Sequence, residues 1–168
     1  SSGTTTYIKQ LPVKIYKVTN AGNLTQVASG TTSNTGTFSK SGISIGSNVT
    51  GLRVTVTFDN SSLSIQDNSG SIYSFSYDIP ITSTNISVSL PGSNSLTEEQ
   101  VLAYAAWKNG LAALSMHSSI SSTSLGKLVF RSEVNDDLGS ACYGTQYIHL
   151  NGSSATRDYL DTNVIQHE

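Results

Sequence analysis

The amino-acid sequence predicts two structural units of different class, an all-β sandwich over residues 1–92 and an α/β unit over residues 93–168. Within Tyr7–Leu90, apolar and polar residues alternate with a period of two in several short runs, as in strands with one buried face. The cluster Pro91-Gly-Ser-Asn-Ser95 then breaks this pattern. After this cluster the apolar residues recur about every 3.6 positions, which is the period of an α-helix. The change of period marks the expected boundary between the two units.

The composition indicates an exported protein. The chain has 168 residues, a net charge of -2 and only 12% charged residues, whereas 30 serines and 19 threonines make it rich in hydroxyl groups. A mildly acidic chain without a Lys/Arg cluster is not expected to bind nucleic acid or an anionic membrane surface. No apolar run approaches the roughly 20 residues of a transmembrane span. We therefore expect a secreted protein, extracellular or at the cell surface, whose signal peptide, if any, has been removed or is left out of the sequence given.

Short strands and tight turns account for the first unit. In the run Leu52–Phe58 apolar side chains alternate with polar ones, so one face is predicted to be buried and the other wet. Asn34-Thr-Gly36 and Asp67-Asn-Ser-Gly70 contain residues that tolerate positive φ and close turns. About seven short strands at this spacing predict an antiparallel sandwich. The expected strands are Val13–Val18, Leu24–Ala28, Thr37–Ser39, Leu52–Phe58, Leu63–Gln66, Tyr73–Tyr77 and Ile86–Leu90.

One part of this unit carries a motif. The run Val13–Val18 is followed by Val27–Phe38, which ends in the pattern T-x-x-x-G-x-F. This order resembles the transthyretin-like modules of secreted peptidases and surface proteins. The resemblance implies a transthyretin/Ig-like sandwich without catalytic residues, which acts as a spacer or packing module or contacts glycan or surface proteins through its loops. Asp59, Asp67 and Asp78 could contribute to a calcium site, but the sequence has no D-x-D-x-D-G run to support one.

A long helix over Leu96–Met116 is expected to open the second unit. Ser95-Leu-Thr-Glu98 fits a capping box, in which the Ser hydroxyl and the Glu carboxylate bind N–H groups of the first turn. Trp107 is expected in the core, and His117 at the helix C-terminus, where an imidazolium can meet the free carbonyl groups. The apolar face is predicted to carry Val101, Tyr104, Ala105, Leu111, Ala112 and Leu114 or Ser115, while Ala103, Ala106 and Ala113 leave room for a sheet.

The segments after this helix suggest a family. Strands are expected over Lys127–Val134 and Gln146–Leu150. A polar loop follows, in which Asp158 and Asp161 are expected to start and cap the next helix, and leads into Val164-Ile-Gln-His-Glu168. This order resembles the N-terminal subdomain of a zincin metallopeptidase. It is similar in particular to secreted bacterial proteins in which a Y-I-x-L strand and a D-x-x-D loop precede V-I-x-H-E-Y-G-H.

The resemblance assigns roles to four residues. In H-E-x-x-H, two histidines one helical turn apart bind zinc, and the glutamate between them is the general base. His167 then corresponds to a zinc ligand and Glu168 to the catalytic base. Tyr147 and His149 share one face of their strand and would border the substrate cleft. The second histidine and the third ligand are not in these 168 residues, so we expect this chain alone to hold no zinc tightly.

Two functions from different classes follow. In the first, the chain is a fragment of a secreted zinc-dependent metalloendopeptidase. The parent enzyme would act on a peptide or protein, and the fragment itself is expected to be inactive. The second is that of a non-enzymatic extracellular structural or adhesive subunit, in which exposed strand edges would allow polymerisation by strand exchange. Cys142, the single cysteine, is expected either as a small buried side chain or as the partner of a cysteine further along the parent chain.

Overall fold

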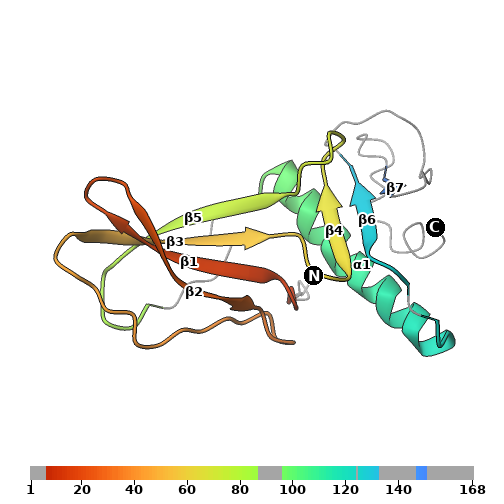
Figure 1. Ribbon diagram of the computed structural model, residues 1–168, viewed down its shortest axis with the longest axis horizontal. Coiled ribbons are helices and arrows are strands. Elements are labelled where there is room, and N and C mark those ends of the chain that lie inside the picture. Colours follow the sequence, from red (N-terminus) through yellow and green to blue (C-terminus); the bar gives the residue numbers. More distant parts are fainter. Residues whose placement is uncertain (1–6, 87–95, 124, 133–146, 151–168) are drawn as a thin grey trace, which may run out of the picture. The chain divides into compact units, whose positions relative to one another are not determined.

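The computed structural model describes residues 7–86, 96–123, 125–132 and 147–150. These residues are mostly β and form an antiparallel sheet, a smaller parallel sheet and one helix (Figure 1). The chain divides into two compact units, each made of two segments. Unit 1 comprises Ser1–Thr57 and Ser74–Ser95, and unit 2 comprises Phe58–Tyr73 and Leu96–Glu168.

Unit 1 contains a four-stranded antiparallel sheet with the strand order β2-β1-β3-β5. Each strand includes most of one predicted run and extends a few residues beyond it. The predicted strand Thr37–Ser39 does not form. Ile86 is not in a strand, and the rest of the predicted strand Ile86–Leu90 lies outside the described residues. The strands are β1 (Pro12–Thr19), β2 (Leu24–Thr31), β3 (Val49–Thr57) and β5 (Ser74–Pro80).

The alternating pattern determines which face of this sheet is buried. Val56 lies opposite Val13 in β1 and opposite Phe75 in β5, so the three side chains share one face. Val13 is 5% exposed and Val56 is 3% exposed. Arg53 and Thr55, which alternate with the buried residues of β3, lie half-buried on the opposite face. The predicted division into an apolar and a polar face is therefore confirmed for β3.

The T-x-x-x-G-x-F segment has a structural role in unit 1. The Thr32 hydroxyl donates a hydrogen bond to the Ile8 carbonyl oxygen at 2.7 Å. Gly36 has a φ of 68°, a left-handed conformation that glycine adopts without a steric penalty. The ring of Phe38 lies so close to Gly30 that a Cβ at Gly30 would be 2.5 Å from a ring carbon. The motif thus attaches the chain after β2 to the chain before β1 and packs an aromatic ring on the sheet.

Unit 2 contains a three-stranded sheet with the order β4-β6-β7, in which both neighbouring pairs are parallel. The strands are β4 (Leu63–Gln66), β6 (Leu128–Arg131) and β7 (Ile148–His149). The sequence predicts all three strands, but its assignment of Leu63–Gln66 to the sandwich is wrong, because β4 pairs with β6. Leu63, Ser64 and Ile65 are all fully buried, as expected for a strand covered on both faces.

Helix α1 (Glu98–Ile120) begins two residues later than predicted, and its cap is Thr97. The Thr97 Oγ1 accepts a hydrogen bond from the Gln100 N–H at 3.2 Å, and the Gln100 Oε1 accepts one from the Thr97 N–H at 3.0 Å. This is a capping box, but not the predicted Ser95–Glu98 pair, because Thr97-Glu-Glu-Gln100 fits the same pattern. His117 lies in the last turn, as predicted.

The buried face of α1 is rotated from the predicted one by about one residue position. Val101, Tyr104 and Ala105 were expected in the core and are only half-buried. Ala103 and Ala106, which were expected to leave room for a sheet, are fully buried, and Leu111 is buried as predicted, whereas Ala112 is exposed. The buried residues are Leu102, Ala103, Ala106, Trp107, Asn109, Gly110 and Leu111.

Aromatic side chains fill the space between helix and sheet in unit 2. Trp107 is fully buried, as predicted, and its ring is 5.9 Å from that of Phe58 in an edge-to-face arrangement. The Tyr104 ring is 5.1 Å from the Phe58 ring in a similar geometry. Because Phe58 precedes β4 and belongs to unit 2, this core is built from two separate stretches of the sequence.

Candidate functional site

Of the four predicted site residues, the structure describes two. His167 and Glu168 lie outside the described residues, as do Asp158, Asp161 and Cys142. Tyr147 is half-buried, directly before β7. The backbone of His149 forms the last position of β7, which lies at one end of the described sheet order β4-β6-β7. The structure therefore defines the surroundings of Tyr147 and the strand position of His149.

Three residues lie side by side at the carboxyl ends of the parallel strands. The register pairs Gln66 of β4 with Arg131 of β6, and Arg131 with His149 of β7. Successive residues of a strand face opposite sides of the sheet. Since Phe130 is on the side where α1 packs, Gln66 and Arg131 are on the other side. This row, together with Tyr147, is the candidate site.

Arg131 is the central residue of the candidate site. Its guanidinium carbon lies 4.0 Å from the centre of the Tyr147 ring, which is the geometry of a cation–π contact. Its Nε donates a hydrogen bond to the Gln66 Oε1 at 3.0 Å. Gln66 is itself oriented, because its Nε2 lies 3.4 Å from the Ser64 Oγ and can donate to it. The guanidinium is therefore held by a neutral amide and by an aromatic ring.

The turn after β4 approaches the same guanidinium. Gly70 has a φ of 89°, and a Cβ at this position would be 2.9 Å from the Arg131 Nη2. The Asp67 Oδ1 closes the turn by accepting hydrogen bonds from the Ser71 N–H at 2.7 Å and from the Ser69 hydroxyl at 2.6 Å. Burial raises the pKa of Asp67, but the hydrogen bonds from the Ser69 hydroxyl and from the backbone outweigh it, so this pKa lies below its ordinary value.

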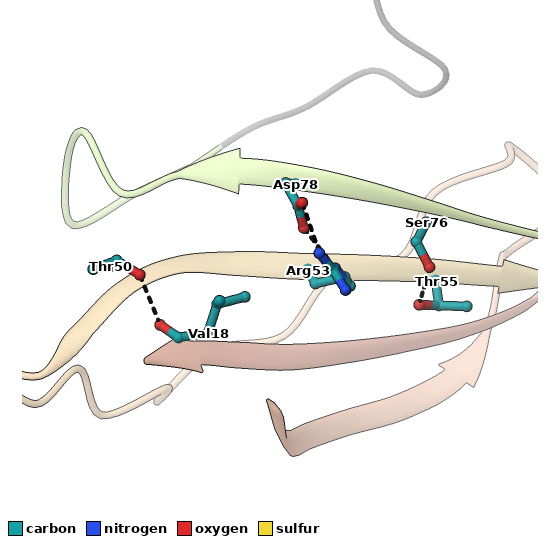
Figure 2. A network of polar contacts seen from close by, with 6 residues as sticks. All are labelled: Val18, Thr50, Arg53, Thr55, Ser76 and Asp78. Atoms are coloured by element: carbon teal, nitrogen blue, oxygen red, sulfur yellow. Dashed lines mark hydrogen bonds and ion pairs between the residues drawn. The ribbon is translucent and has the colours of Figure 1, made fainter. Parts of the chain in front are cut away.

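A second polar cluster lies on the exposed face of the sheet in unit 1 (Figure 2). The Arg53 Nε and Nη2 donate to the two carboxylate oxygens of Asp78 at 2.6 and 2.8 Å. In the next row the Thr55 and Ser76 hydroxyls are 2.9 Å apart. The hydrogen bond between Arg53 and Asp78 lowers the pKa of Asp78 and raises the pKa of Arg53. These contacts pair the charges and hydroxyls with one another, so the cluster joins β3 to β5.

The aspartates considered for a calcium site each have another partner. Asp59 accepts a hydrogen bond from the Lys127 Nζ at 2.5 Å, Asp67 closes its own turn, and Asp78 pairs with Arg53. In the part of the chain that the structure describes, no three His, Cys, Asp or Glu residues are grouped so that they could hold a metal ion.

Sequence reasoning missed Arg131 and Gln66. One signal was present, because Arg131 ends an otherwise apolar strand run, Leu128-Val-Phe-Arg131. Its neighbour Gln66 could not be found in this way, because the pairing of β4 with β6 joins residues more than 60 positions apart in the chain.

Comparison with known protein families and with curated proteins found no match to this chain. No helix within the described ranges is both long and apolar enough to cross a membrane.

Proposed function

We infer that this chain is part of a secreted zinc metalloendopeptidase, with a transthyretin-like β-sandwich module followed by the N-terminal portion of a zincin-like domain. The observation that carries this proposal is the run Val164-Ile-Gln-His167-Glu168, whose last two residues match the first two of H-E-x-x-H and which follows Asp158-Tyr-Leu-Asp161 in the sequence. The helix α1 packed on parallel strands in unit 2 is compatible with such a domain and supports the proposal.

Within the proposed enzyme, residues have separate roles. His167 would be a zinc ligand and Glu168 the general base, while Tyr147 and His149 would border the peptide or protein substrate. The bound zinc would supply Lewis-acid chemistry. A catalytic zinc site needs three protein ligands, and this chain supplies one of them, so the 168 residues do not form a complete site. We therefore expect the isolated chain neither to retain zinc nor to hydrolyse peptides.

The experiment uses the full-length enzyme that this proposal implies. Glu168→Gln keeps the shape of the side chain but removes the base, so zinc should be retained while peptidase activity falls by about 100-fold or more. His167→Ala should lose both zinc and activity. Metal analysis after dialysis and a peptide-cleavage assay measure the two properties separately. Near wild-type cleavage by the Glu168→Gln protein would rule out the metallopeptidase.

A second candidate function is that of an extracellular structural or adhesive subunit. The observation that favours it is the position of β2 at one end of the antiparallel sheet, with most of its residues exposed. An exposed edge strand can pair with a strand from another chain. In this case the β module would contact glycans or surface proteins, or polymerise by strand exchange. Concentration-dependent filaments of the isolated chain, seen by light scattering, would favour this function over the enzyme.

A further inference from the structure

The charge of Arg131 has no counter-ion among the residues that the structure describes. Arg53 is paired with Asp78 and Lys127 with Asp59, whereas no described carboxylate lies within ion-pair distance of Arg131. The hydrogen bond of its side chain to Gln66 and its stacking on the Tyr147 ring are contacts with uncharged groups. Arg131 is also half-buried, so part of its hydration is lost. A ligand with a negative charge would compensate the guanidinium for this lost hydration.

The contacts of Arg131 also fix its position before any ligand binds. A guanidinium has five N–H donors, and the hydrogen bond to Gln66 uses the one on Nε. The stacking on Tyr147 and the close passage of the turn at Gly70 restrict the plane of the group. An arginine that is already ordered loses little side-chain freedom on binding. Among the described residues, no hydrogen bond uses the donors on the two Nη atoms, so we assign these donors to a ligand.

The place of Arg131 in the fold agrees with a binding role. Arg131 ends β6, and the neighbouring row positions Gln66 and His149 end β4 and β7, so all three are at the carboxyl ends of parallel strands. Ligands of open sheets with parallel strands bind outside these ends.

We propose that Arg131, positioned by Gln66 and Tyr147, binds the carboxylate of a small ligand or peptide. A single planar guanidinium matches the two oxygens of a carboxylate in a two-pronged arrangement. The carboxylate can be an acidic side chain or the C-terminal group of a peptide. This binding does not depend on the proposed peptidase activity, because it requires neither zinc nor His167 and Glu168.

Heteronuclear NMR of the arginine Nε–Hε groups in the 168-residue chain, at low salt and neutral pH, tests the proposal. The probes are N-acetyl-glutamate amide for a side-chain carboxylate and N-acetyl-alanyl-alanine for a terminal one. N-acetyl-glutamine amide and N-acetyl-alanyl-alanine amide are their neutral controls. The Arg131 signal should shift in a saturable way with at least one carboxylate probe and with neither amide. The probe that binds more tightly identifies the source of the carboxylate.

Variants assign the binding to Arg131. Binding by the variants is followed through backbone amide signals of β6 and β7, because the variants lack the Arg131 Nε–Hε group. Arg131→Gln should abolish binding, and Arg131→Lys should weaken it by about tenfold or more, because an ammonium lacks the fork of donors. The matched control Arg53→Gln, which changes an arginine already paired with Asp78, should bind as the wild-type chain does. Circular dichroism checks the fold, and the lysine variant, which keeps the charge, gives the answer if the glutamine variant is unfolded.

Tyr147 is a positioning residue in this proposal. Tyr147→Leu should weaken probe binding by several-fold. Tyr147→Phe, which keeps the aromatic face, should bind the probe as the wild-type chain does. A merely structural role for Arg131 predicts no saturable shift of its signal with either carboxylate. That result, or equal binding by the wild-type and Arg131→Lys chains, would overturn the proposal.

Discussion

Two arginines of this protein lie on β-sheets but have different kinds of partner. Arg53 lies on the polar face of the sheet in unit 1 and donates to both carboxylate oxygens of Asp78 on the adjacent strand. Arg131 ends a strand in unit 2, where an amide and an aromatic ring hold it. The first charge is neutralised within the described structure and contributes to strand pairing. The second is ordered without a counter-ion among the described residues, which is why we assign binding to it.

The pair Arg53–Asp78 should make a small, pH-dependent contribution to stability. Because the pKa of Asp78 is lowered in the folded protein, its stabilising effect is present above the ordinary aspartate pKa of about 4 and is lost as the pH falls through the lower folded value. The effect is small because the Asp78 side chain is 65% exposed. Carboxyl NMR titration should show Asp78 titrating below its ordinary range.

A variant and an internal control make this prediction specific. In Arg53→Gln the pKa of Asp78 should move up toward its ordinary value, and added salt should have a similar but weaker effect in the wild-type chain. Asp67, whose pKa is lowered by its own turn, should not respond to the substitution. An unchanged Asp78 titration in Arg53→Gln would contradict the role given to the ion pair.

Among the elements, the contact of α1 with its sheet depends most on one residue. Gly110 is buried, and a Cβ there would be 2.9 Å from the Leu63 side chain and 3.0 Å from Phe130, both fully buried. Alanine favours a helix by about 0.5–1 kcal/mol over glycine, but an extra methyl group in a packed core costs about 1–3 kcal/mol. Gly110→Ala should therefore lower the free energy of unfolding by about 1 kcal/mol. Urea denaturation measures this change.

The control for this substitution is Gly126→Ala, because a Cβ at Gly126 would meet no atom within 4 Å. We expect it to change stability by less than about 0.5 kcal/mol. If Gly110→Ala were as stable as the wild-type chain or more stable, the helix would not be held as close to the sheet as the structure indicates.

The elements also show what a sequence can reveal. Alternation predicted β3 and β5, and the 3.6-residue period predicted α1, because both patterns are local. The partner of β4 could not be predicted, since Leu63–Gln66 has apolar residues typical of any buried strand and its neighbour β6 is distant in the sequence. The candidate site follows from that pairing. Tyr147 and His149 could be proposed from their own strand, whereas the contact of Arg131 with Gln66 required the sheet order.

For the whole molecule, the main feature is the segment that leaves one unit and joins the other. β3 and β5 are directly paired in unit 1, yet Phe58–Tyr73 between them belongs to unit 2. Phe58, Leu63 and Ile65 of this segment are fully buried there. A division of the chain in sequence order, after residue 92, would leave these side chains without the helix and strand that cover them.

This gives a prediction about which pieces can fold alone. Thr57 and Ser74 are opposite each other in the β3–β5 register, so an Asn-Gly turn can replace residues 58–73 and close an antiparallel hairpin. The piece 1–95 with this replacement should be a monomer with strand-type circular dichroism and cooperative unfolding. The unaltered piece 1–95 should aggregate or bind a hydrophobic dye, because its segment 58–73 exposes a large apolar surface. Gel filtration and dye binding compare the two pieces. If the unaltered piece were equally monomeric and free of dye, the segment Phe58–Tyr73 would not need unit 2, and the division of the chain found here would be wrong.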